Sequence, residues 1–236
     1  MKNKFKALIA TLLLLSAILS SCASRHAGLS VTDAYSAASD SLSSANEYEI
    51  ITERKVTSTD GLEVISSDKA TYRRKADRFY MQNSDVSNPL LNMEGWYIDG
   101  YSYASYRTMK VKTKASIEEY AGSTSSSVSP YLPSIETDFL KGLRFEGEGD
   151  EKYFTVTFSD AQYVDIFGSA GIGGTIDGEV RFTVYFDSDA NVTRTTTEFY
   201  MILSETRLYS VTNTSIKLSS PNIDPPADAD SYQLVD

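Results

Sequence analysis

The sequence predicts an α+β fold, with one large curved antiparallel sheet and short helices packed on one of its faces. Three observations indicate this fold. About ten segments alternate apolar and polar residues, and they fall into two runs. Asp-Gly pairs at Asp60-Gly61 and Asp99-Gly100 separate neighbouring segments, as hairpin turns do. One helical stretch precedes the first run and others separate the two runs, which is typical of an antiparallel sheet covered on one face.

The N-terminus decides where the rest of the chain is located. Lys2, Lys4 and Lys6 form a basic region, and an uncharged, leucine-rich stretch follows, so residues 1–21 are predicted to be a secretory signal. That stretch is shorter than the roughly 20 residues that cross a bilayer. The signal ends in Leu19-Ser20-Ser21-Cys22, which resembles the lipobox of bacterial lipoproteins.

The lipobox resemblance implies that the signal is removed just before Cys22 and that the Cys22 thiol carries acyl chains. The protein is then anchored by lipid on the extracytoplasmic face of a bacterial membrane. An ordinary signal that happens to contain a cysteine is the alternative. Cys22 is the only cysteine of the chain, so it cannot form an internal disulfide.

Charge narrows the choice of partners. The chain has 22 basic and 32 acidic residues and a net charge of −10. Loss of the three lysines of the signal changes this charge to −13. Nucleic acid is excluded as a partner, because binding phosphates requires clustered Lys and Arg. No second apolar run is long enough to cross a bilayer.

The first half of the mature chain is predicted to be a tether, a helix and a run of strands. Residues 22–30 are small and polar and form the tether, and a single domain is expected over 31–220. Apolar residues at helical spacing predict an amphipathic helix over 32–44. The predicted strands cover 48–58, 62–74, 78–83, 95–98 and 101–113. In the last of these, Tyr101, Tyr103 and Met109 are expected to share one face.

The second half begins with a helical insertion. Ser116 and Glu119 resemble a capping box at the start of one helix, and a second short helix is expected near 134–141. This insertion is interpreted as a lid or plug over one end of the sheet. The remaining strands are predicted over 143–148, 153–159, 179–187, 192–203 and 206–218, with a short helix over 160–167. Residues 221–236 form an acidic, proline-containing tail, which either lies on the domain or trails from it.

The residues that usually carry catalysis are scarce. His26 is the only histidine and lies in the tether, which argues against a histidine-based triad or metal site. The carboxylate pairs Glu118/Glu119 and Asp150/Glu151 lie beside exposed turns and are expected to be solvated. Residues 168–174 are rich in glycine but lack the Gly-Lys-Ser/Thr ending of a phosphate loop. The sequence therefore predicts no enzyme, no cofactor and no metal.

Two apolar stripes are candidates for the wall of a cavity. The two hypotheses for them are a cavity and an ordinary core filled by the helices, and the sequence favours neither. The candidate lining residues are Trp96, Ile98, Tyr101, Tyr103 and Met109 on one hairpin and Phe182, Val184 and Phe186 on a later strand.

The order of the elements resembles the LolA-like family of lipoprotein-carrier and lipid-binding domains. The resemblance covers Val31 to about Leu218. It depends on the early helix, the hairpin around Gly95-Trp96-Tyr97-Ile98-Asp99-Gly100, the central helices and the strand over 179–187. It implies an unclosed half-barrel with helices on its concave side. No ligand-contacting residue is carried over, and soluble carriers of the family are unanchored, unlike this chain.

Two functions follow as hypotheses. In the first, the anchored protein binds an acyl chain, a lipid or another apolar ligand in the half-barrel. In the second, the half-barrel is a filled core and the protein is a non-enzymatic envelope protein that binds a protein partner. A carboxylate hydrolase is a distant third. A continuous apolar cavity favours the first hypothesis and a filled core the second.

Overall fold

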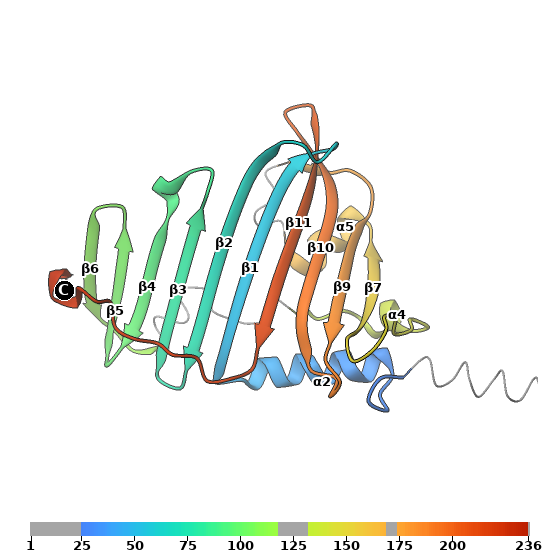
Figure 1. The fold of residues 1–236 in the computed structure, drawn as a ribbon, viewed down its shortest axis with the longest axis horizontal. Coiled ribbons are helices and arrows are strands. Elements are labelled where there is room, and N and C mark those ends of the chain that lie inside the picture. Colours follow the sequence, from blue (N-terminus) through green and yellow to red (C-terminus); the bar gives the residue numbers. More distant parts are fainter. Residues whose placement is uncertain (1–24, 118–131, 169–173, 236) are drawn as a thin grey trace, which may run out of the picture.

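The computed structural model describes residues 25–117, 132–168 and 174–235. Within these ranges all twelve strands belong to one sheet, whose order is β12-β6-β5-β4-β3-β2-β1-β11-β10-β9-β7, with β8 beside β10. The order does not close on itself, and Figure 1 shows β6, which lies next to the terminal strand β12, and β7 at opposite ends of the sheet. The predicted α+β half-barrel is therefore confirmed.

The strands and helices have the following bounds. The strands are β1 (Glu47–Ser58), β2 (Val64–Lys75), β3 (Arg78–Asp85), β4 (Met93–Ile98), β5 (Tyr101–Tyr106), β6 (Met109–Lys114), β7 (Lys152–Phe158), β8 (Thr175–Ile176), β9 (Val180–Phe186), β10 (Val192–Leu203), β11 (Thr206–Lys217) and β12 (Gln233–Leu234). The helices are α2 (Val31–Ser44), α4 (Thr137–Leu140) and α5 (Asp160–Phe167), with 3-10 turns η1 (Pro89–Leu91) and η3 (Ala229–Ser231). All strand pairs are antiparallel except β12 with β6.

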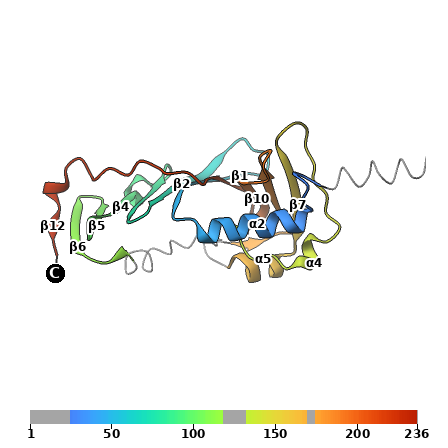
Figure 2. The same ribbon diagram turned by 90° about the horizontal axis from the view of Figure 1, so that it is seen from below.

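Helix α2 begins where the sequence predicts. The Ser30 side chain accepts a hydrogen bond from the Asp33 N–H, and Asp33 adds a negative charge to the first turn. The helix buries one apolar stripe, which consists of Val31, Ala34, Tyr35, Ala38 and Leu42. This stripe belongs to the main core, which it shares with β1, β7, β9, β10 and β11. Figures 1 and 2 show α2 lying along one end of the sheet.

Helix α5 also forms as predicted and lies on the same side of the sheet. A capping box between Ser159 and Gln162 starts it, and Tyr163, Ile166 and Phe167 pack against the main core. We call the sheet face that α2 and α5 cover the concave face and the other the convex face. The C-terminal segment crosses the convex face, on the opposite side of the sheet from the helices (Figure 2).

The predicted helical insertion is only partly described. Residues 118–131 lie outside the described residues, and so does most of the helix expected to start at Ser116. The second expected helix is the single turn α4. The prediction of a strand over 143–148 is wrong. Of these residues only Glu146 pairs, in an isolated bridge with Tyr153.

The strand β8 was not predicted, because it has only two residues and directly follows the glycine-rich stretch. Residues 169–173 of that stretch lie outside the described residues. A β-carbon at Gly174 would overlap the carbonyl group of Ile202, so glycine lets the chain approach β10 closely here. The glycine therefore has a structural reason that does not involve phosphate.

Candidate functional site

The strand β9 is part of a filled core. Phe182, Val184 and Phe186 are at most 1% exposed. The Phe182 ring lies 5.2 Å from that of Phe167, measured between ring centroids, and the Phe186 ring lies 5.5 Å from that of Phe145. Their inward orientation, expected from the alternation, is confirmed, and they are buried among other side chains of the main core.

The other predicted group lies in a second, smaller core. Trp96 and Ile98 are 8% and 4% exposed and pack with Ile223 and Tyr232 of the C-terminal segment. Tyr103 contacts the same cluster, with its ring centroid 5.4 Å from that of Tyr232. The tail therefore covers these aromatic residues on the convex face.

The two predicted groups lie on opposite faces of the sheet, so they do not form one cavity wall. The strand registers lead from Trp96 across β3 and β2 to Glu49, and from Phe182 across β10 and β11 to Arg54. Glu49 and Arg54 are five residues apart in β1. Because successive side chains of a strand alternate between faces, an odd step changes the face.

The expectation that Met109 shares a face with Tyr101 and Tyr103 is wrong. The stretch predicted as one strand over 101–113 is two strands, β5 and β6, joined at Arg107 and Thr108. Arg107 has a φ of 55°, and a two-residue hairpin turn requires such a positive φ. Glycine or asparagine usually occupies such a position, but the sequence has neither here. Tyr106 pairs with Met109, so the turn puts Met109 on the face opposite Tyr103. Met109 is 60% exposed and Tyr101 is 36% exposed.

An open groove does exist on the concave face, beside the filled core. It has a volume of about 560 Å³ and lies over β1, β2, β10 and β11, with Tyr163 of α5 at its side. Ligand sites commonly measure roughly 300–1,000 Å³. The apolar residues that line it are Val56, Ile65, Phe199, Met201, Leu203 and Leu208.

Polar groups line the part of the groove that is farther from the hairpin tips. Arg54 Nε donates to Asp68 Oδ1 at 2.8 Å, and the hydroxyls of Thr52 and Thr214 lie 3.1 Å apart across β1 and β11. Burial raises the pKa of the Tyr163 phenol, against a smaller lowering by Arg54, so this phenol is neutral at physiological pH. The groove is therefore apolar toward the hairpin tips and polar toward its middle, which suits an amphiphile.

The sequence interpretation missed this groove for a physical reason. In β10 the apolar positions Phe199, Met201 and Leu203 alternate, but Thr195 and Thr197 occupy the same face nearer its start. A threonine in a strand usually indicates a solvated position, although the two threonines are at most 9% exposed here. The alternation from Phe199 to Leu203 is the signal that could have predicted the groove, but the apolar alternation in β9 is more regular.

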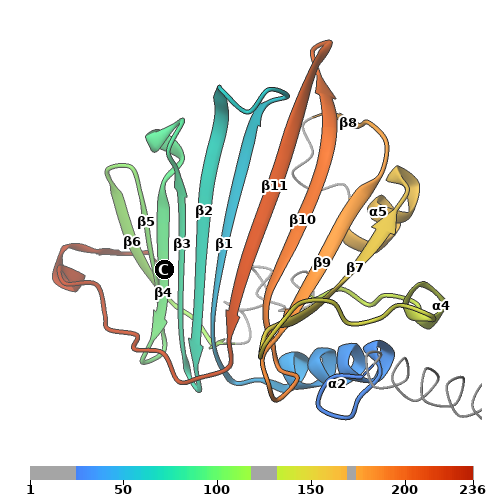
Figure 3. The same ribbon diagram turned by 45° about the vertical axis from the view of Figure 1, so that its right-hand side comes forward.

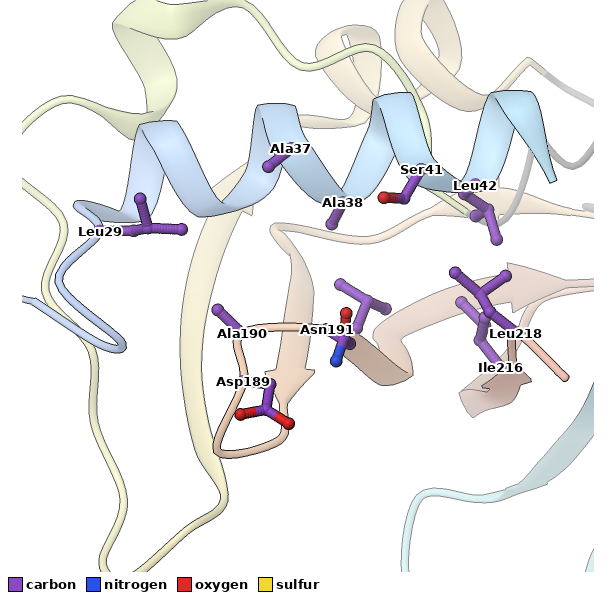
Figure 4. Close-up of a pocket in the computed structure, with 11 residues that line it drawn as sticks. Leu29, Ala37, Ala38, Ser41, Leu42, Asp189, Ala190, Asn191, Ile216 and Leu218 are labelled. Carbon is purple, nitrogen blue, oxygen red and sulfur yellow. The ribbon is translucent and has the colours of Figure 1, made fainter.

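A smaller cavity lies under α2. It measures about 110 Å³, and Figure 4 shows it between the helix, the turn after β9 and the end of β11. Ala37, Ala38 and Ser41 of the helix face Ala190 and Asn191 of the turn. Since a water molecule occupies about 30 Å³ of liquid, this cavity has room for a few waters at most and is too small for an acyl chain.

His26 joins the N-terminal segment to the domain. Its Nε2–H donates to the backbone carbonyl of Asp187, and its ring lies 5.4 Å from that of Phe145. The side chain is 8% exposed. His26 and Leu29 also form an isolated bridge, which closes a tight turn just before α2.

Other site types find no support in the described part of the chain. Residues 25–117, 132–168 and 174–235 contain no cluster of three His, Cys, Asp or Glu able to hold a metal ion. No helix among them has the length and apolar character needed to cross a membrane. Glu151, from one of the carboxylate pairs, is 3.6 Å from Arg194 in an exposed ion pair.

Comparisons with known proteins give similarities of fold. No family model and no curated protein matches the chain. Lipoprotein LppX of Mycobacterium tuberculosis aligns over 82% of this chain and 97% of its own, with 11% identity and a TM-score of 0.39. A LolA superfamily protein from Nitrosomonas europaea covers 82% and 96%, with 10% identity and a TM-score of 0.27.

A third solved structure, described as an outer membrane lipoprotein-sorting protein domain from Vibrio parahaemolyticus, covers 78% of this chain and 90% of its own, with 10% identity and a TM-score of 0.26. These likenesses concern the arrangement of strands and helices, and no binding residue is carried over from them.

Proposed function

We propose that this protein is a non-enzymatic, extracytoplasmic lipoprotein, anchored through Cys22, that holds an acyl chain of a lipid in the groove over β1, β2, β10 and β11. The observation that carries the proposal is the open groove itself. Its apolar floor includes Phe199, Met201 and Leu208, and Arg54 and Asp68 lie at its polar end. Transfer of an acyl chain from water to such an apolar floor lowers the free energy. A polar head is accommodated beside the ion pair.

A titration with a fluorescent fatty acid tests the binding. The protein for this assay carries Cys22→Ser, so that no covalent acyl chain or detergent competes. Saturable binding is expected, and Met201→Asp should weaken it at least tenfold, because the acyl chain would desolvate a carboxylate. Val211→Asp is the matched control, since Val211 is a half-buried residue of β11 on the convex face. Equal affinities of the two variants would refute the groove.

The interaction-protein hypothesis keeps one observation in its favour. The core around Phe182 is filled, so part of the half-barrel has no room for a ligand. If the parent protein shows no saturable fatty-acid binding and organic extraction recovers no lipid from it, that hypothesis replaces ours.

The anchor has its own test. Cys22→Ser should abolish metabolic labelling with palmitate and release the protein from the membrane fraction. A variant that remains in that fraction with unchanged labelling would contradict the anchor and leave the groove untouched.

A further inference from the structure

Exposed aliphatic side chains are gathered on the tips of two neighbouring hairpins. The β1–β2 hairpin and the β10–β11 hairpin are adjacent, because β1 pairs with β11 from Glu49 to Ser58, up to the hairpin tips. Both tips lie at the end of the sheet away from α2 (Figures 1 and 3). We call these residues, which are 37–87% exposed, the apolar rim: Leu62, Val64, Ile65, Ile202 and Leu203.

The same end of the sheet has more exposed aliphatic residues on the next connection. Val86, Leu90 and Leu91 lie between β3 and β4 and are 48–74% exposed. At the other end, near α2, the exposed large apolar side chains of the described residues include Leu218. Single exposed apolar residues are ordinary on a protein surface, but a set spread over three neighbouring tips at one end is not.

The rim is continuous with the groove. Ile65 and Leu203 line the groove and are also 41% and 37% exposed at the tips. An amphiphile that enters the groove from this end therefore passes between aliphatic side chains. The rim and the groove form one apolar path from the surface to Phe199.

The charges near the rim indicate which surface it fits. Asp60, Glu63 and Glu205 lie in or beside the two turns, while Arg207 is paired with Asp177 at 2.6 Å. This end is therefore acidic and is repelled by anionic headgroups. The rim also contains none of the Trp, Tyr or Arg residues that dominate protein–protein hot spots. Its chemistry fits the acyl region of a zwitterionic bilayer.

We infer that the apolar rim inserts into the surface of a zwitterionic lipid bilayer and brings the mouth of the groove against its acyl chains. The inference rests on the proposed function for its purpose, since it gives the groove a source of ligand. The insertion itself is measured without any added ligand, so it can fail or succeed independently of the groove.

The experiment is co-sedimentation with phosphatidylcholine vesicles, using the full mature chain with Cys22→Ser to remove the anchor. We expect the parent to bind, with equal binding in low and high salt, because aliphatic burial is not screened. The double variant Leu62→Asp/Ile202→Asp should bind at least tenfold more weakly. Leu218→Asp, at the opposite end of the sheet and 42% exposed, is the control and should bind as the parent does.

Several results would overturn the inference. They are absence of parent binding, equal binding of the rim variant, and binding that needs phosphatidylglycerol and disappears in salt. Unchanged thermal unfolding of the variants shows that they are folded, and Leu62→Ser/Ile202→Ser repeats the test without new charges. Met201→Asp separates the two proposals, because it should lose fatty-acid binding and keep vesicle binding.

Discussion

At the scale of single residues, Tyr35 connects helix α2 to the chain before α4. Its hydroxyl donates to the carbonyl of Pro133 at 2.5 Å, and the side chain is 3% exposed. Burial raises the pKa of Tyr35, since the phenolate would have to form without water. The same burial raises the pKa of Tyr80 and of Tyr209 to about 12, with Glu94 and Glu198 adding to the two shifts.

These tyrosines make the protein less stable in alkali. Their pKa is higher in the folded than in the unfolded chain, so the stability they contribute is complete below about pH 10 and is lost as the pH rises above it. Tyr35→Phe should reduce the free energy of unfolding by about 1–3 kcal/mol at neutral pH, because the Pro133 carbonyl loses its donor. It should also flatten the fall above pH 10 by up to about 1.4 kcal/mol per pH unit. Urea unfolding from pH 7 to 11 measures both, and equal slopes would contradict the assignment.

Phe182 and Phe199 give a direct comparison of a filled core with a groove wall. Phe182→Ala removes a ring enclosed on all sides and should reduce the free energy of unfolding by about 3–5 kcal/mol. Phe199→Ala removes a ring that borders open space, so about half that loss is expected. Urea unfolding of the two variants measures the difference. If Phe199→Ala is as destabilising as Phe182→Ala, the groove is closed in solution.

At the scale of elements, the local signals predict the structure well where one residue type determines the geometry. The helix over 31–44, the helix over 160–167 and the Asp-Gly turn after β1 all form as expected, and the structure adds the caps at Ser30 and Ser159. The turn at Arg107 and Thr108 could not be predicted from the sequence, because neither residue is one that favours positive φ. This single turn reverses the face of Met109 and accounts for one error in the predicted cavity wall.

Helix α2 provides an element-scale prediction. Ser30→Ala removes the acceptor for the Asp33 N–H and should reduce the free energy of unfolding by about 1 kcal/mol, whereas Ser30→Gly should lose only a few tenths. Thermal and urea unfolding of both variants measure this. A loss that is equal for the two substitutions would mean that the side-chain hydrogen bond contributes nothing.

At the scale of the whole molecule, the C-terminal segment completes the convex face. Ile223 and Tyr232 cover Trp96 and Ile98, Lys110 forms an ion pair with Asp228, and β12 adds a parallel strand to β6. The sequence allowed the tail either to lie on the domain or to trail from it. The structure shows that it lies on the domain, where buried apolar side chains hold it.

Trp96 reports on this contact because it is the only tryptophan of the chain. Deletion of residues 221–236 should shift its fluorescence emission to longer wavelength, since water replaces the tail. Tyr232→Ala should produce part of the shift, and Gln233→Ala, at an exposed neighbouring position, should produce none. An unchanged spectrum after the deletion would show that the tail leaves this face in solution.

The candidate site was harder to predict than the fold because a cavity depends on which faces of distant strands meet. Alternation within β9 correctly places Phe182 inward, but it cannot say whether a helix fills the space in front of it. The groove lies where β1, β2, β10 and β11 come together, and two of these strands are far apart in the sequence from the other two. Pairing of the first and last strands is a property of the whole sheet.

Photo-crosslinking with a diazirine-labelled fatty acid, followed by peptide mass spectrometry, tests the central claim most directly. If an acyl chain occupies the concave groove, the adducts should lie on Phe199, Met201 or Leu208 and should disappear when unlabelled fatty acid competes. Adducts confined to the convex face around Trp96, or labelling that no competitor reduces, would contradict the account.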